Sequence, residues 1–154
     1  MSYLILKFIH IIGAVVIMGT GTGIAFFMVM AHRSKDPAFI AKTASTVVVA
    51  DKVFTLTAII VQPISGYFLM REIGASFGDF WIVASIGLFI VAGVFWLPVV
   101  WMQMRMRDLA RAAVSQGSAL PDQYYTLYRR WFLFGFPGFG AITAIIWLMI
   151  SKPI

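Results

Sequence analysis

Residues 80–104 read FWIVASIGLFIVAGVFWLPVVWMQM, without a single Asp, Glu, Lys, Arg or His. An α-helix rises about 1.5 Å per residue, so about 20 apolar residues cross the roughly 30 Å hydrocarbon core of a bilayer. Backbone polar groups in that core must be paired within the segment, which a helix achieves. This stretch therefore predicts a membrane-spanning helix.

Three further stretches have the same character, at about residues 4–31, 46–70 and 131–150. Four such spans take up about two-thirds of the chain and leave only short connections. Helices joined in this way pack antiparallel in sequence. We predict one all-α integral membrane domain over residues 1–154, a four-helix transmembrane bundle of up-down topology. The first span is too long to be the apolar region of a cleavable signal peptide.

The composition excludes several classes of protein. Hydrophobic residues make up 61% of the chain and charged residues 12%, which excludes a soluble globule and a disordered chain. Cysteine is absent, so disulfides, iron–sulfur clusters and cysteine-bound zinc are excluded. No histidine pair has metal-ligand spacing, and we expect no metal site.

The basic residues indicate an orientation. Three lie beside the chain termini or the central turn: Lys7, Arg71 and Lys152. Eight lie around the other two connections: Arg33, Lys35, Lys42, Arg105, Arg107, Arg111, Arg129 and Arg130. The positive-inside rule predicts a multi-pass protein of the bacterial inner membrane with both termini outside. The net charge of +6 is then a property of membrane-flanking loops and does not indicate nucleic-acid binding.

Local signals refine the spans. Asp36-Pro37, Asp79 and Pro121-Asp122 predict helix starts. Gly19 and Gly23 form a Gly-xxx-Gly step that predicts a helix–helix seam. The segment Gly135-Phe-Pro-Gly-Phe-Gly140 predicts a kinked or loosened fourth span. An aromatic belt at the cytoplasmic interface is predicted from four residues, Tyr124, Tyr125, Tyr128 and Trp131.

Two histidines are present, and they differ in setting. His32 falls at the cytoplasmic end of its span, where a solvated interfacial residue is expected. His10 lies within the span and shares a helical face with Gly13, so it is expected to point into the bundle. Two interpretations stay open for His10. It is a structural residue bonded to a backbone carbonyl or to Gln62, or it ligates a cofactor such as haem b or contacts a quinone.

Asp51 is the only carboxylate within a span. Steps of three and four residues from Asp51 give a polar and small stripe, which predicts a face in the bundle interior: Thr55, Ala58, Gln62 and Ser65. Trp96 and Gln103 share a face of the third span, and we expect them near Asp51, with the indole N–H as a donor. Arg129 or Arg130 would reach Asp51 from the start of the fourth span. The carboxylate is then either part of a buried ion-pair network or a proton-relay or substrate-contacting group.

His10 and Asp51 differ in depth by roughly 20 Å, so they do not form one acid–base pair. His10 and His32 are roughly 33 Å apart along one helix, so a single haem cannot bridge them. A haem ligated by two histidines would need His10 from two copies of the chain.

Five segments resemble those of a bacterial family of predicted integral membrane proteins of unknown function. They are Lys7-Phe-Ile-His10-Ile-Ile-Gly-Ala14, Gln62-Pro-Ile-Ser-Gly66, Trp96 to Gln103, Tyr128-Arg-Arg-Trp131 and Lys152-Pro153. More distantly, the chain is similar to the copper-resistance D membrane proteins and to the HemJ membrane protoporphyrinogen oxidases. That similarity implies His10 as a haem b ligand.

Three functions remain open at this stage. One is a non-catalytic accessory, assembly or partner-binding bundle, which is slightly favoured. The second is a haem b-binding or quinone-contacting redox protein with His10 as the ligand. The third is an oligomeric small-solute or proton-coupled transporter, with a path lined by Asp51, Gln62 and Ser65. The expected partners are the lipid bilayer and further copies of the chain or a larger membrane complex.

Overall fold

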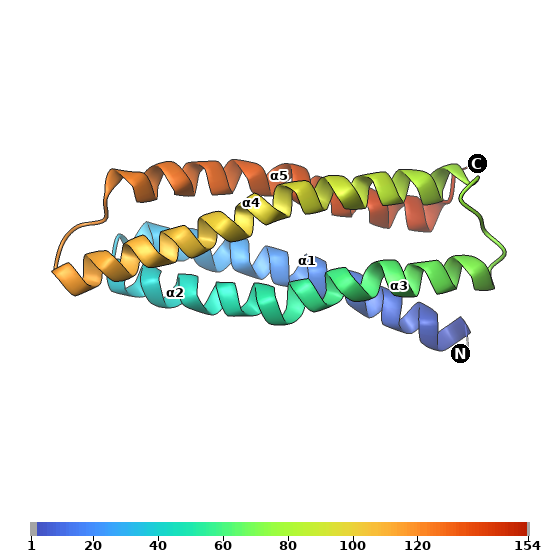
Figure 1. Ribbon diagram of the computed structural model, residues 1–154, viewed down its shortest axis with the longest axis horizontal. Coiled ribbons are helices and arrows are strands. Elements are labelled where there is room, and N and C mark those ends of the chain that lie inside the picture. Colours follow the sequence, from blue (N-terminus) through green and yellow to red (C-terminus); the bar gives the residue numbers. More distant parts are fainter. Residues whose placement is uncertain (1–2, 154) are drawn as a thin grey trace.

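The computed structural model describes residues 3–153, all of whose regular structure is helical. The helices are α1 (Tyr3–Ser34), α2 (Pro37–Ala50), α3 (Leu56–Glu72), α4 (Phe80–Gln116) and α5 (Asp122–Ser151), with a π-helical turn at Asp51–Thr55. That turn joins α2 to α3, so the two form one continuous rod over Pro37–Glu72 (Figure 1). The described chain therefore has four rods, each long and apolar enough to cross a membrane. The predicted all-α, antiparallel four-helix architecture is confirmed.

The helices begin where the sequence predicts, but the Asp36 and Asp79 carboxylates accept different hydrogen bonds. The Asp36 carboxylate accepts a hydrogen bond from the Ala38 N–H at 2.9 Å, and Pro37 occupies the first turn of α2. Asp79 also precedes its helix, but its carboxylate instead accepts from the Ser76 N–H at 2.7 Å. Asp79 thus closes the turn before α4 rather than capping the helix itself.

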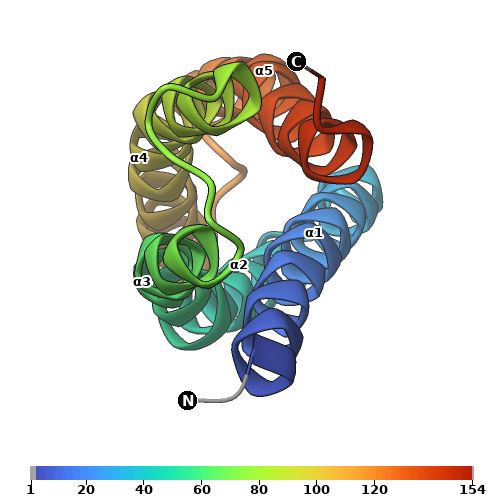
Figure 2. The ribbon, with the colours of Figure 1, turned by 90° about the vertical axis from the view of Figure 1, so that its right-hand side faces the viewer.

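The rods form a ring (Figure 2). α4 packs along α5, α2 packs against α4, and α1 packs along both α2 and α3. Contact between α1 and α5 is sparse by comparison. The two pairs α1–α3 and α4–α5 are therefore held together chiefly through α2.

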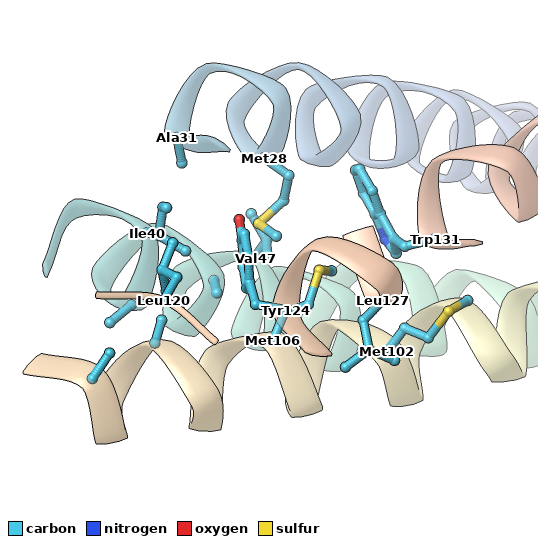
Figure 3. Close-up of a cluster of buried hydrophobic side chains, with 14 of the residues drawn as sticks. Met28, Ala31, Ile40, Val47, Met102, Met106, Leu120, Tyr124, Leu127 and Trp131 are labelled. Carbon is cyan, nitrogen blue, oxygen red and sulfur yellow. The ribbon is translucent and has the colours of Figure 1, made fainter. Parts of the chain in front are cut away.

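The packed core lies at the end of the bundle where α1 meets α2 and α4 meets α5. Figure 3 shows its side chains converging from four helices, with Met28, Ile40, Met106 and Tyr124 among those with no exposed surface. Alanines on the facing surfaces, such as Ala44 and Ala110, allow α2 and α4 to approach closely. Away from this core, the outer surface carries exposed Leu, Ile, Val and Phe side chains, as a bilayer-facing surface requires.

The predicted aromatic belt is partly wrong. Tyr124 is fully buried and Trp131 is 4% exposed, because these two residues are seven apart and share the inward face of α5. Only Tyr125 is exposed, and Tyr128 is half-buried. His32 is likewise not simply solvated, since its ring stacks on Tyr128 with 3.5 Å between centroids.

The seam predicted at Gly19 and Gly23 also needs correction. Gly19 and Gly23 have no atom within 4 Å of an added Cβ, so they do not form a seam within the chain. The close approach lies elsewhere, at Gly13 and Gly66. Residues 135–140 remain α-helical within α5 in spite of Pro137.

The side of the membrane that holds the termini stays a prediction of the charge distribution, and the absence of cysteine makes it testable. A cysteine at Ser118, in the α4–α5 connection, should resist a membrane-impermeant maleimide in intact spheroplasts. A cysteine at Ala75, in the α3–α4 connection, should react. The reverse pattern would contradict the predicted orientation.

Candidate functional site

The polar stripe predicted on the second span is buried. Asp51 and Thr55 are each 4% exposed, and Ala58, Gln62 and Ser65 are also buried. The π-helical turn begins at Asp51, whose carbonyl accepts the Leu56 N–H five residues on. Single π-helical turns within helices are frequent at functional sites. This one places Asp51 and Thr55 side by side on the inner face.

The Asp51 carboxylate is held by side chains from other helices. Trp96 Nε1 donates to Asp51 Oδ1 over a long 3.5 Å. With the Gln103 amide oriented to satisfy both neighbours, its nitrogen donates to Asp51 Oδ2 at 2.7 Å, and its oxygen accepts from Trp131 Nε1 at 3.2 Å. We call Asp51, Trp96, Gln103 and Trp131 the carboxylate cluster. It joins the α2–α3 rod, α4 and α5 in one network.

The expected ion pair with Asp51 is wrong. Arg129 and Arg130 are exposed, and so is Lys52. Across residues 3–153, the only side-chain ion pair is Arg107 with Asp108 at 2.8 Å. The helical turn of α5 that carries Trp131 inward turns both arginines outward. Asp51 is therefore buried with neutral donors and without a cation.

A cavity of about 580 Å³ extends from the carboxylate cluster into the bundle. Its lining runs over residues 51–59 of the α2–α3 rod, 89–103 of α4 and 131–142 of α5, with a patch of α1 at 21–25. The lining begins at Asp51 on the α2–α3 rod and at Trp131 on α5, and it ends at Gln103 on the antiparallel α4. These three residues therefore lie at the same end of the cavity. Phenylalanines form much of the remaining wall, including Phe89, Phe95, Phe134, Phe136 and Phe139.

Glycine makes the space. Trp131, Gly135, Gly138 and Ile142 follow at steps of four and three residues, so they lie on one face of α5, and all line the cavity. Gly135, and Gly93 on α4, have nothing within 4 Å of an added Cβ. Two glycines of the segment predicted to kink the fourth span therefore hollow the bundle. This spacing of Trp131 and two glycines along one helical face is the sequence signal that could have predicted the inward position of Trp131 and the cavity.

His10 belongs to a separate contact between α1 and α3. Its Nδ1 lies 2.9 Å from Ser65 Oγ, and the Ser65 hydroxyl lies 2.8 Å from the Val61 carbonyl. A hydroxyl has one hydrogen, so donation to Val61 makes Ser65 an acceptor from His10 Nδ1–H. Gln62 Nε2 also donates to the backbone carbonyl of His10 at 3.1 Å.

This contact is tight because both helices have glycine there. A Cβ on Gly13 would lie 3.2 Å from the Gln62 amide nitrogen, and a Cβ on Gly66 would lie 3.2 Å from His10 Cε1. His10 thus points into the bundle as predicted, and its ring partner is Ser65. Neither His10, Gln62 nor Ser65 lines the cavity, which takes in only Asp51 and Thr55 of the stripe.

Among residues 3–153, no group of three or more acidic, histidine or cysteine side chains could hold a metal ion. His10 as a cofactor ligand stays a prediction. Because the neutral ring donates through Nδ1, the lone pair of Nε2 is available to bind a metal or a haem iron.

Four apolar rods around a buried carboxylate define a small polytopic integral membrane protein. The chain belongs to the family described as predicted integral membrane protein, DUF2269, which it matches over residues 4–153. No curated protein and no solved structure matches the chain, so the more distant similarity to copper-resistance D proteins and HemJ gains no support.

Replacing Gly66 by Leu should destabilise the protein, because the new side chain meets the His10 ring and forces α3 away from α1. The loss should be about 1–3 kcal/mol, the usual cost of overpacking a close contact. Gly19→Leu is the matched control, since the space in front of Gly19 is open. Thermal unfolding in detergent measures both, and equal melting temperatures would contradict the close α1–α3 contact.

Replacing Gln103 by Leu should destabilise the protein by about 1–3 kcal/mol, because Asp51 loses its shortest hydrogen bond and stays buried. Adding Asp51→Leu to that variant should recover most of the loss, since the unpaired acceptor is then also removed. A double-mutant cycle of unfolding in detergent checks this. Strictly additive effects would show that the two side chains do not interact.

Proposed function

We propose that this protein binds a neutral, lipid-soluble molecule with a flat ring and a hydrogen-bonding head group, the chemical class of the membrane quinones. The observation that carries the proposal is the cavity of about 580 Å³ that ends on the carboxylate cluster. Ligand sites in proteins are typically apolar cavities of this size with a few converging polar groups. The proposal moves the expected quinone contact from His10 to Asp51.

The charge of the lining supports a neutral ligand. Asp51 is the only charged residue among those that line the cavity, and none of them is Lys, Arg or His. A phosphate or carboxylate group there would meet a carboxylate and no cation, which is costly in a medium of low dielectric constant.

Haem b does not fit this cavity for the same reason. It carries two propionates, and the lining has neither a cation to pair with them nor a histidine to bind the iron. His10, the expected haem ligand, lies in the α1–α3 contact instead.

The polar end of the cavity supports a head group that both accepts and donates hydrogen bonds. The Gln103 amide has a second hydrogen besides the one that it donates to Asp51, and Trp96 Nε1 makes only a long contact of 3.5 Å with Asp51, so both are donors for a ligand. The Asp51 carboxylate is an acceptor. A quinone carbonyl can accept from the donors, and the hydroxyl of the reduced form can donate to Asp51. The phenylalanine walls offer faces and edges for the ring.

The α1–α5 side supports access from the bilayer. The lining residues there are exposed, among them Gly21, Thr22 and Ala25 on α1 and Gly135 and Phe136 on α5. The two helices that flank this side, α1 and α5, contact each other only sparsely. A lipid-soluble molecule can then enter without crossing the packed core.

The test is quenching of tryptophan fluorescence by a short-chain alkyl benzoquinone, with the purified protein in detergent. Trp96 and Trp131 line the cavity, so the wild type should show saturable quenching. Gly135→Leu fills open space in front of the cluster and should weaken the apparent affinity about tenfold or more. Gly140→Leu on the same helix, also in open space but outside the lining, should bind like the wild type.

Two results would overturn this proposal. Equal, non-saturable quenching in all three proteins would favour the non-catalytic accessory bundle. A Soret band that shifts on reduction and is lost in His10→Ala would instead favour a haem protein. Circular dichroism and gel filtration of each variant show that the comparison is made between folded proteins.

A further inference from the structure

A second hollow lies between α4 and α5, near the end of the bundle that holds the packed core. It has a volume of about 310 Å³. Gln123, Thr126 and Arg130 line it from α5 and, at steps of three and four residues, follow one face of that helix. Trp101 and Pro98 line it from α4, and Phe134 continues the α5 face one turn beyond Arg130. We call this hollow the α4–α5 groove.

The groove changes from polar to apolar along the helix axis. Its polar end carries one guanidinium, one amide and one hydroxyl, all of them exposed. Its apolar end carries Pro98, Phe134 and an indole, Trp101, that is 54% exposed. Arg130 directly precedes the predicted fourth span, so this change occurs at the depth where a bilayer passes from head groups to acyl chains.

Charge determines the kind of head group. Arg130 has no carboxylate within ion-pair distance among the described residues. Eight Lys and Arg residues lie around the α1–α2 and α4–α5 connections, at this end of the bundle. Only three carboxylates accompany them there: Asp36, Asp108 and Asp122. Asp108 is already paired with Arg107. The groove therefore stands in a positive field with a free guanidinium at its polar end.

We propose that the α4–α5 groove binds one anionic phospholipid. The phosphate pairs with the Arg130 guanidinium, and the Gln123 amide donates to head-group oxygens. The Thr126 hydroxyl donates to the Asp122 carbonyl at 3.2 Å, so it serves the head group as an acceptor. One acyl chain lies along Trp101, Pro98 and Phe134. Basic pockets between membrane helices bind anionic head groups in this manner. The two proposed sites thus differ in the charge of their ligands: the cavity at Asp51 takes a neutral molecule and the groove at Arg130 takes an anionic one.

Native mass spectrometry of the purified protein tests the site, with phosphatidylglycerol and phosphatidylcholine of identical acyl chains as the ligands. The wild type should retain one phosphatidylglycerol in preference to phosphatidylcholine. Arg130→Gln should lower that retention about tenfold, because a charge-assisted contact is lost. Arg129→Gln is the matched control, since it removes the same charge from the neighbouring exposed residue outside the groove.

Equal retention of the two lipids by the wild type would overturn the proposal. So would an equal loss in both variants, which would show a general effect of charge and no defined site. Glycerol phosphate, added in excess, should not displace the lipid, because it lacks the chain that the apolar end holds. Displacement by it would indicate a free phosphate site instead. Arg130 lies outside the cavity lining, so Arg130→Gln should leave quinone binding unchanged, which separates a failure of this proposal from a failure of the quinone proposal.

Discussion

The buried carboxylate of Asp51 is the constraint around which the helices are arranged. An ionisable group inside a membrane bundle needs hydrogen-bond donors, and no residue on its own helix face supplies a cation. The donors come from α4 through Trp96 and Gln103, and Gln103 is in turn held by Trp131 of α5. This network sets the rotation of three rods about their axes. Because Trp131 faces inward, Arg129 and Arg130 face outward. Arg130 then lines the α4–α5 groove.

The network also stands at a boundary within the bundle. Toward the α1–α2 and α4–α5 connections, a cluster of buried aliphatic, methionine and aromatic side chains fills the interior (Figure 3). Beyond the network, glycines on α4 and α5 face the centre and leave the cavity. A rigid end beside a hollow middle is suited to holding polar groups in place around a ligand, since the packed end fixes their positions. The contact between α1 and α3 lies outside the cavity lining. It is held by the hydrogen bond between His10 and Ser65 and by the close approach at Gly13 and Gly66.

Much of this could be read from the residues. The spans follow from uninterrupted apolar stretches, and the helix starts follow from Asp-Pro and Asp signals, because both depend only on local chemistry. The interior stripe from Asp51 to Ser65 follows from helical periodicity, and so does the proximity of Trp96 and Gln103 to Asp51. His10 was correctly expected to face inward. The ion pair with Arg129 or Arg130 was not correct, because a position within reach along the sequence says nothing of helix rotation.

The sequence by itself determined that this is a four-span membrane protein with one buried carboxylate on an interior face, since those properties depend on hydrophobicity and on the periodicity of single helices. The tertiary structure decided the rest. It made Ser65 the partner of His10, brought Trp131 out of the expected interfacial belt into the carboxylate cluster, and placed glycines of α5 in the wall of a cavity. Each of these depends on the rotation and spacing of helices that are distant in sequence, which no single helix records. The same packing placed an apolar cavity and a basic groove on neighbouring faces of α5, with Phe134 in the lining of both.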